Sequence, residues 1–281
     1  MQVLYTLLLA VIGVAAGFIG SMTGLGGAVV IMPVLAIFLG VPVEYAVGAS
    51  LVATIATSSG AAAAYIRDRI TNIRIGMSLE IGTTMGAIGG ALAAAAIYAH
   101  NLSDAILVLF GIALLSSLYV MLRRKSRAVT TKGDRSTRIL QLDGSYYDKS
   151  SKRNVHYKGV RWLWGELVMI CAGFLSGLLG IGSGVLKVLG MDSAMRLPIK
   201  VSTATSDFMI GVTAVTGSGI YWALGYIRPT LVAPVVVGTA IGAYMGSKVM
   251  ENERNKIITR VFLVILVIVA VESILRGVGI A

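Results

Sequence analysis

Two long apolar segments of this 281-residue chain are each interrupted by a short run of small residues. A helix that is broken inside a membrane exposes backbone N–H groups at its new N-terminus, and hydrocarbon offers them no partner. Such N-termini attract anions. We therefore expect the interruptions to hold an anionic ligand, the alternative being a kink that serves packing alone. The residues concerned are Gly24, Gly26 and Gly27 in the first segment and Gly180, Gly182, Ser183 and Gly184 in the second.

Small hydroxyl residues follow each interrupted segment, after Pro42 or Pro198. Ser50 lies in the first half, and Thr205 and Ser206 lie in the second. Hydroxyl side chains that open a helix satisfy its free N–H groups as caps. They can equally donate hydrogen bonds to a bound anion, so the sequence leaves both roles open.

A lysine and an aspartate are placed in apolar sequence in the second half. Lys187 comes three residues after Gly184, and Asp207 follows Ser206. A charged side chain at membrane depth is costly, and it predicts a functional role with a specific partner. We expect Lys187 to balance the charge of the substrate or to pair with Asp207, and Asp207 to couple transport to a proton. The alternatives are a snorkelling lysine and a purely structural pair.

Three glutamates are weaker candidates for a role inside the membrane. Glu80 and Glu166 lie near the ends of apolar runs, so we expect them at the membrane interface. Glu272 lies in the last run and is a weaker candidate for coupling.

The composition excludes a water-soluble globule. Hydrophobic residues make up 56% of the chain and charged residues only 13%, about half the share in soluble domains. Runs long enough to enter or cross a bilayer predict an all-α polytopic membrane protein. They lie at about residues 3–39, 46–66, 75–99, 105–122, 162–190, 201–222, 231–250 and 257–275.

The runs form two similar sets of four, which predicts an internal duplication of four to five helical elements per half. An offset of 156 residues places Gly24 on Gly180 and Ser50 on Ser206 without a gap. The matches are mostly glycine, proline and hydroxyl residues rather than generic apolar ones. Two matching stripes of spaced glycines predict tight helix packing rather than ligand binding. These stripes are Gly82, Gly86 and Gly90, and Gly238, Gly242 and Gly246.

A basic linker separates the two halves. We assign residues 1–122 to the first membrane repeat, 123–160 to the linker and 161–281 to the second repeat. Residues 123–161 carry a net charge of +9 out of +11 for the chain. The positive-inside rule explains this excess in a cytoplasmic linker, so we expect no nucleic-acid partner. Two strand-like runs, at residues 138–148 and 153–158, predict a small β-hairpin.

The basic residues also predict the orientation of each repeat. If the interrupted run of the second half turns back, Arg196, Lys200, Arg254 and Lys256 lie on the cytoplasmic side and only Arg228 lies outside. Each half then has an odd number of crossings, and the repeats are inverted with both termini outside. A parallel arrangement of four plus four helices is the alternative.

The sequence contains no pattern that indicates an enzyme. It lacks a Walker A lysine motif and a His-Glu-x-x-His motif, and its histidines, His100 and His156, lie in predicted loops. We therefore predict no catalytic residues, no metal site and no cofactor.

Both interruptions resemble those of a known transporter family. Residues 17–33, 47–51 and 173–188 are similar to the sulfite exporter TauE/SafE family, and the likeness covers nearly the whole membrane part. The resemblance implies transport of sulfite, sulfoacetate or related organosulfonates. The chain departs from the family at Ser183, where a glycine is expected, and it has no proline after Val188 comparable to Pro33.

These observations together predict a secondary transporter in the cytoplasmic membrane. We expect small sulfur-containing anions as its substrate, protons or another ion for coupling, and alternating access around the interrupted helices. A passive anion channel is the main alternative, and a membrane receptor or enzyme using the linker hairpin is a further one. The sequence leaves a homo-oligomer open.

Overall fold

The computed structural model describes residues 2–23, 26–123, 130, 133–148, 152–252 and 256–279. Most of these residues are helical. The first half contains α1 (Gln2–Thr23), α2 (Ala28–Pro33), the π-helical segment η1 (Val34–Phe38), α3 (Val43–Arg67), α4 (Ile73–Ala99) and α5 (Ser103–Arg123). The linker contains α6 (Arg135–Leu140), β1 (Asp143–Asp148) and β2 (Arg153–Lys158). The second half contains α7 (Trp162–Leu179), α8 (Gly184–Leu189), η2 (Gly190–Ala194), α9 (Ile199–Ala223), α10 (Pro229–Asn252) and α11 (Lys256–Gly277).

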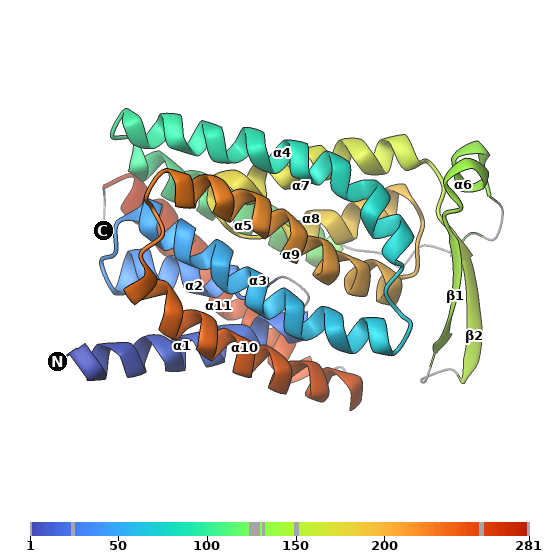
Figure 1. The fold of residues 1–281 in the computed structure, drawn as a ribbon, viewed down its shortest axis with the longest axis horizontal. Helices are drawn as coiled ribbons and strands as arrows, with labels where there is room; N and C mark the ends of the chain where they lie inside the picture. The colour runs from blue at the N-terminus through green and yellow to red at the C-terminus, as the bar shows by residue number, and fades with distance from the viewer. Residues whose placement is uncertain are drawn as a thin grey trace.

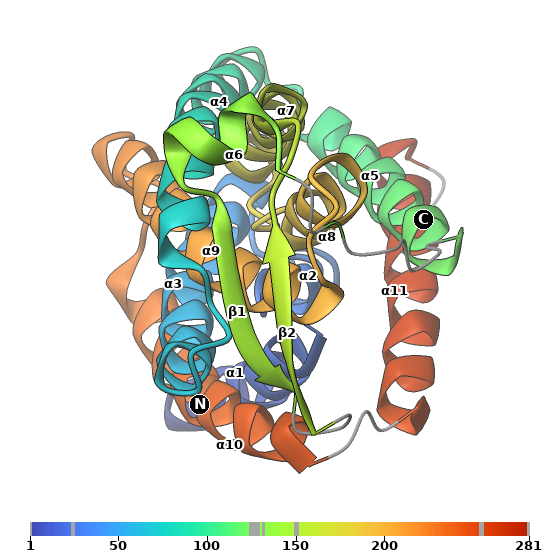
Figure 2. The ribbon, with the colours of Figure 1, turned by 90° about the vertical axis from the view of Figure 1, so that its right-hand side faces the viewer.

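The long helices form one elongated bundle. The hairpin of β1 and β2 covers one end of it, and both chain termini lie at the other end (Figure 1). Viewed from the hairpin end, the two strands run across the end of the helical bundle (Figure 2). The hairpin thus marks one end of the bundle and the termini mark the opposite end.

Each half begins with a helix that stops and a shorter one that follows it. α1 is followed by α2 and η1, and α7 is followed by α8 and η2. The second of these segments runs out and back, because Val160, just before α7, donates its backbone N–H to the carbonyl of Met195, just after η2, at 3.2 Å. Residues 161–195 therefore leave the hairpin end and return to it.

The helices of the second half begin and end close to the positions reached by adding 156 to those of the first half. Ala28–Pro33 becomes Gly184–Leu189, and Val43–Arg67 becomes Ile199–Ala223. The packing has the same regularity: α1 lies against α10 and α4 against α7, while α3 contacts α9 and α5 contacts α11. If each helix is replaced by its counterpart in the other half, the α1–α10 contact becomes the α7–α4 contact, and the α3–α9 and α5–α11 contacts become themselves.

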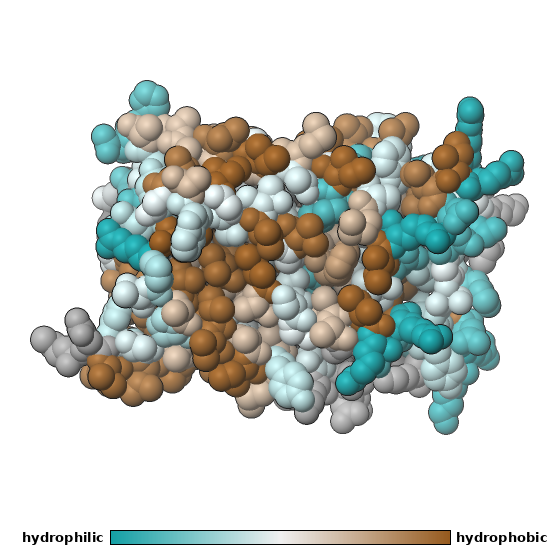
Figure 3. All heavy atoms as spheres, viewed as in Figure 1, coloured by the Kyte–Doolittle hydropathy of each residue, from teal (hydrophilic) through white to brown (hydrophobic). Residues whose placement is uncertain are grey.

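The outer surface of the bundle is apolar, and the helix contacts use small residues. On α4 the exposed positions include Met77, Ile81 and Met85, whereas Gly86 and Gly90 face inward. Five helices of the described residues are long and apolar enough to cross a membrane: Val3–Ser21, Val43–Arg67, Ile73–Ala99, Trp162–Leu179 and Pro229–Ser247. In Figure 3 apolar residues cover the middle of the molecule, and hydrophilic residues gather most densely at the hairpin end. The predicted polytopic helical protein is confirmed.

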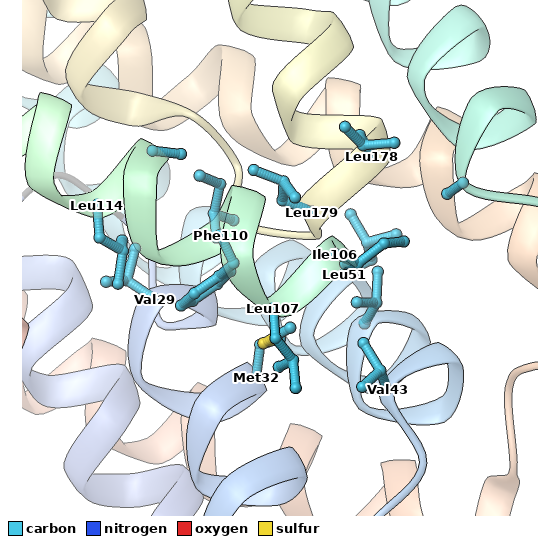
Figure 4. Close-up of a cluster of buried hydrophobic side chains, with 14 of the residues drawn as sticks. Val29, Met32, Val43, Leu51, Ile106, Leu107, Phe110, Leu114, Leu178 and Leu179 are labelled. Carbon is cyan, nitrogen blue, oxygen red and sulfur yellow. The ribbon is translucent and has the colours of Figure 1, made fainter. Parts of the chain in front are cut away.

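A hydrophobic cluster fills the space between the two halves (Figure 4). It joins α2 to α5, α7 and α11, so the short helix α2 is held by elements of both halves. Its members include Val29, Met32, Phe110, Leu114, Leu178, Leu179 and Leu266. The cluster therefore includes residues of α2 and residues beside the second interruption, such as Leu179 and Ile181.

The predicted hairpin is present, with a shorter first strand than expected. β1 and β2 pair antiparallel, with Tyr146 opposite Val155. Residues 138–140, the start of the first strand-like run, instead belong to α6. Asp134 caps this helix: its carboxylate accepts the backbone N–H of Thr137 at 2.9 Å and that of Arg161 at 2.6 Å. The cap outweighs the strand propensity of so short a run.

Replacing Asp134 by alanine should loosen α6 and the start of α7. Partial burial acts to raise the pKa of this carboxyl, but hydrogen bonds from the Arg161 and Thr137 backbone and the Ser136 hydroxyl hold the pKa well below its ordinary value. The cap therefore stabilises the fold above the unfolded carboxyl pKa of about 3.9 and is lost as the pH falls through the folded value. We expect tryptic cleavage at Arg138 to be about fivefold faster in Asp134→Ala at pH 8, a loss of about 1 kcal/mol. Unchanged cleavage relative to Ser145→Ala, an exposed position on β1, would contradict this role.

Candidate functional site

The second interruption is a tight left-handed turn between α7 and α8. Gly180 and Gly182 have positive φ values of 70° and 69°, which glycine adopts without a steric penalty. Ser183 also has a positive φ, 47°, a conformation that is uncommon for a residue with a side chain. The turn is thus built from glycines and one strained serine, and the serine immediately precedes α8.

The hydroxyl of Ser183 is buried without a hydrogen-bond partner among the described residues. It does not cap α8, although Ser183 holds the N-cap position. A buried hydroxyl without a partner costs free energy, so its retention in a native structure points to a functional role. A ligand that accepts a hydrogen bond from this hydroxyl would supply the missing partner.

A small cavity lies between the short helices of the two halves. Val29 on α2 faces it from the first half, and Ile181, Ser183 and Gly184 face it from the second. Leu114 on α5 and Leu266 on α11 also line the cavity. The free space is about that of one water molecule. Both interrupted segments therefore meet at one cavity, which has no room for a sulfur oxyanion in this conformation.

The first interruption is described only in part, and Gly24 lies outside the described residues. Gly26 has a positive φ of 76° and lies beside Thr54 on α3 and Ile210 on α9. Gly27 precedes α2, and its carbonyl accepts the backbone N–H of Ile31 at 3.1 Å. The first interruption thus meets the two central helices, α3 and α9, which belong to different halves.

The predicted hydroxyl residues are buried within helices and do not cap them. α3 begins at Val43 and α9 at Ile199, so Ser50 and Ser206 lie about two turns inside, and the capping interpretation is wrong. The Ser50 hydroxyl lies 3.0 Å from the carbonyl oxygen of Gly180 and 2.8 Å from that of Val47 in its own helix, so its one proton is shared between them. Ser206 donates to the carbonyl of Gly184 at 3.2 Å. Ser50 therefore contacts the first residue of the second interruption, and Ser206 contacts its last residue.

Thr205 points away from the interruptions. Its hydroxyl accepts the backbone N–H of Asn72 at 3.1 Å, at the start of α4 near the hairpin. Asn72 in turn donates to the phenol oxygen of Tyr157 on β2 at 3.0 Å. Thr205 therefore joins α9 to the hairpin end rather than to the cavity.

Lys187 is fully buried, but its predicted pairing with Asp207 is wrong. Its ammonium group donates to the carbonyl of Met209 at 3.2 Å and to the hydroxyl of Thr213, both on α9. The Asp207 carboxylate is also buried, and its Oδ2 atom has no hydrogen-bond partner among the described residues. The two charged groups therefore make no described contact with each other.

Sequence reasoning missed the role of Glu80. Its side chain is buried in α4 rather than at the interface, and its Oε1 atom accepts the Thr213 hydroxyl at 2.6 Å. The spacing of Glu80, Thr83 and Ala87 puts all three on the face of α4 that turns inward, and this spacing is the signal that would have found it. Glu80 thereby connects the first half to Lys187 through Thr213.

Hydroxyl and cationic donors lie in two neighbouring parts of this region. The cavity between the short helices presents the free Ser183 hydroxyl, while Lys187 lies one turn further along α8 and faces α9. A small anion could displace existing partners at either place once the short helices move apart. Cationic and hydroxyl donors in an apolar setting suit an anion better than a cation.

Comparisons with known proteins point to membrane transport. The family model described as sulfite exporter TauE/SafE matches residues 9–273. The chain is 30% identical over 280 residues to the probable membrane transporter protein YunE of Bacillus subtilis, covering 96% of this chain and 98% of that protein. It is 28% identical to the probable membrane transporter protein YdhB of the same organism, over 87% of this chain and 89% of YdhB. It is 25% identical to the probable membrane transporter protein MJ0441 of Methanocaldococcus jannaschii, over 86% of each chain. No solved structure matches the chain.

Proposed function

Because this chain belongs to the sulfite exporter TauE/SafE family, we propose that it is a secondary transporter of small sulfur-containing anions such as sulfite, sulfoacetate or related organosulfonates. The observation that carries this proposal is the cavity shared by the short helices of the two halves, which is lined in part by Ser183, whose buried hydroxyl has no partner among the described residues. Backbone groups of the interruptions at Gly26, Gly27, Gly180, Gly182 and Gly184 would bind the anion together with Ser183. Gly24 belongs to the same proposal, although it is not among the described residues.

The small size of the cavity supports alternating access. An oxyanion is several times larger than the single water molecule for which the cavity has room, so α2 and α8 must separate before it can bind. Ser50 and Ser206 donate to carbonyls at the edges of the second interruption, so they can release these bonds to an arriving anion. Thr205 joins α9 to the start of α4, so it would link the movements of these two helices at the hairpin end rather than contact the substrate.

We also propose that the membrane repeats, residues 1–122 and 161–281, are inverted around the substrate site. The symmetric packing of the helices and the return of the chain at Met195 support this arrangement. Arg74 donates a hydrogen bond to Gln141 beside the hairpin, and Lys200 forms an ion pair with Asp148 of β1. Arg228 instead packs over the ring of Tyr45 on α3, away from the hairpin. By the positive-inside rule the hairpin end and the linker, residues 123–160, face the cytoplasm of a cytoplasmic membrane.

Coupling to a proton requires a buried group that can exchange one. Asp207, the carboxyl predicted from the sequence, is one candidate because it is buried and its Oδ2 atom has no partner among the described residues. Glu80 is the other, since it shares a hydrogen-bonded chain with Lys187. Lys187 supplies the positive charge in either case.

Transport in proteoliposomes tests the proposal directly. Vesicles containing the purified protein are expected to take up labelled sulfite or sulfoacetate in a saturable manner and to accelerate uptake when loaded with the unlabelled anion. A pH gradient should drive accumulation if a proton is coupled. Flux that rises in proportion to concentration without counterflow would identify a passive channel, and absence of flux for sulfite, sulfoacetate and sulfate would refute the substrate class.

Replacing Ser183 by glycine should weaken anion binding without weakening the fold. Glycine fits the positive φ better than serine and removes only the hydroxyl. A hydrogen bond to a charged group contributes about 1.5–3 kcal/mol, so we expect the Kd for sulfoacetate to rise at least about tenfold. Titration calorimetry in nanodiscs measures this change. Ser176→Ala is the matched control, because the Ser176 hydroxyl is also buried and unpartnered but belongs to α7, before the turn. An equal effect in both variants, or none in Ser183→Gly, would remove this hydroxyl from the site.

A further inference from the structure

Three buried side chains from three helices form one hydrogen-bonded chain. Lys187 on α8 donates to the Thr213 hydroxyl on α9, and Thr213 donates to Glu80 Oε1 on α4 at 2.6 Å. The exposed fractions are 0% for Lys187, 1% for Thr213 and 5% for Glu80. The chain crosses from the second half to the first, so it joins two parts of the bundle that must move relative to each other during alternating access.

The order of donors and acceptors matches a charged pair joined by a hydroxyl. An ammonium group only donates protons and a carboxylate only accepts them. The Thr213 hydroxyl accepts from Lys187 and has two acceptors in reach for its one proton, Glu80 Oε1 at 2.6 Å and the Met209 carbonyl at 2.9 Å. The carboxylate is the nearer and the charged acceptor, so it takes the stronger hydrogen bond.

Glu80 thereby compensates the charge of Lys187, which would otherwise lie unpaired in an apolar interior. Its second oxygen, Oε2, is buried and has no hydrogen-bond partner among the described residues. The bond to Thr213 is therefore made through Oε1, while the Thr83 and Thr84 side chains lie close to the same carboxylate.

An anion that binds Lys187 changes this balance. The ammonium group would then be compensated by the ligand, and Glu80 would be left as a second, unpaired buried charge. Such a charge is strongly unfavourable unless it is neutralised. Uptake of one proton by the Glu80 carboxylate compensates one negative charge of the arriving anion, so a singly charged anion leaves the buried net charge at zero in both the empty and the loaded states.

We propose that Glu80 occupies the place of the substrate's negative charge at Lys187 in the empty transporter, and that it takes up one proton when the anion replaces it. This inference rests on the proposed function and assigns its coupling group. One O–H bond forms on the carboxylate with a proton from solvent, hydrogen bonds are exchanged around Lys187, and no group is oxidised or reduced. Anion and proton are therefore bound together.

The other charged groups near this chain lack its connection to Lys187. Glu166 on α7 lies beside Gly82 of α4 and is half-buried. It accepts a hydrogen bond from the Gly82 backbone and its charge interacts with Glu80 rather than with Lys187. Asp207 lies on α9, but its carboxylate makes no described hydrogen bond or ion pair to Lys187. Among these carboxyls, Glu80 alone is bonded through Thr213 to the lysine in the described part of the chain.

Anion binding should consequently weaken as the pH rises. Binding requires a proton on Glu80, so each pH unit raises the apparent Kd by up to tenfold wherever Glu80 of the empty protein is ionised. Sulfoacetate is the suitable probe, because an ordinary carboxyl has a pKa near 4 and the charge of this ligand is constant between pH 6 and 8.5. Calorimetric titration of the wild-type protein in nanodiscs over this range should show the rise.

The variant Glu80→Gln resembles the protonated carboxyl and should bind sulfoacetate with a Kd that does not change with pH. Glu166→Gln, the matched control on the facing helix, should keep the wild-type slope. Asp207→Asn tests the competing candidate: loss of the slope in this variant together with its retention in Glu80→Gln would overturn the inference. If the wild-type protein binds neither sulfoacetate nor sulfite, the proposed function itself fails; binding with no slope refutes only the role of Glu80.

Infrared difference spectra provide a test that does not depend on the folding of Glu80→Gln. Adding sulfoacetate to the wild-type protein should produce a carboxylic acid band and remove a carboxylate band, and the same change should appear in Glu166→Gln and Asp207→Asn. Calorimetry in buffers of different ionisation enthalpy should give one proton taken up for each anion bound. Absence of the band, or its loss in Asp207→Asn, would contradict the assignment.

Discussion

The variant Lys187→Met is expected to lose about 3–5 kcal/mol of stability, among the largest effects of any single substitution in this protein. Methionine fills much of the same volume, so the loss comes from the charge and not from a cavity. Removing the ammonium group leaves Glu80 buried without its counter-charge and leaves the Met209 carbonyl without this donor. Breaking one side of a buried pair is more destabilising than replacing both sides.

The double variant Lys187→Met, Glu80→Gln should recover most of that loss, because no buried charge remains. Thermal unfolding in detergent or nanodiscs measures the three variants, and the difference between the double variant and the sum of the singles gives the coupling between the two side chains. Lys200→Met is the matched control, since Lys200 is half-exposed at the hairpin end and pairs with Asp148. Additive losses in the double variant would show that Lys187 and Glu80 are not coupled.

The membrane helices and the positions of both interruptions could be predicted from local sequence. Apolar runs of helical length specify the spans, and clustered glycines inside such runs indicate a break in the helix or a close approach of two backbones. The hairpin was predicted for a similar reason, because two strand-like runs flank a short polar turn. Local sequence does not predict α6, because the stability of this helix depends on contacts of Asp134 with Thr137 and with Arg161, which is far away in the sequence.

The partner of Lys187 could not be predicted in the same way. Asp207 was the reasonable choice from sequence, as an acidic residue in the apolar part of the same half. The actual chain passes through Thr213 to Glu80, which is contributed by α4 of the other half. Such a contact depends on how α4, α8 and α9 pack, and one sequence without this packing does not contain it. The inward spacing of Glu80 on α4 predicts its burial but not its partner.

The roles of Ser50 and Ser206 show a related limit. Their small size and hydroxyl groups favour both a helix cap and a ligand contact, and only the start of each helix decides between these roles. α3 and α9 begin directly after Pro42 and Pro198, which leaves both serines well inside. Inside the helices, both hydroxyls reach a backbone carbonyl at the second interruption, and that of Ser50 also reaches the Val47 carbonyl of its own helix.

The glycine stripes, in contrast, have the packing role that their spacing indicated. A Cβ atom added at Gly86 would lie 2.1 Å from the carbonyl oxygen of Ile170, and one at Gly90 would lie 2.0 Å from that of Phe174. On α10, a Cβ at Gly242 would lie 2.0 Å from the carbonyl oxygen of Val14 on α1. Equivalent positions of the two halves therefore make equivalent close contacts, which is why the matches at an offset of 156 residues concentrate on glycine.

The variant Gly90→Ala should consequently destabilise the contact between α4 and α7 by about 1–3 kcal/mol. Alanine has the higher helix propensity, by about 1 kcal/mol, so propensity alone predicts the opposite sign. Overlap decides the outcome, because Cβ contacts under 3.0 Å essentially never occur and the helices would have to separate by about 1 Å. Each kcal/mol corresponds to about 2–4 °C in the midpoint of thermal unfolding.

Gly89→Ala, one position earlier on the same helix, separates these two effects. A Cβ at Gly89 would meet only the ring of Phe174 at 3.7 Å, an ordinary contact, so propensity should dominate and the variant should be as stable as the wild type or more so. Thermal unfolding of both variants in the same nanodiscs makes the comparison. If Gly90→Ala unfolded at or above the wild-type temperature, α4 and α7 could not be packed as closely as the glycine stripe implies, and the symmetric packing that supports inverted repeats would lose one of its contacts.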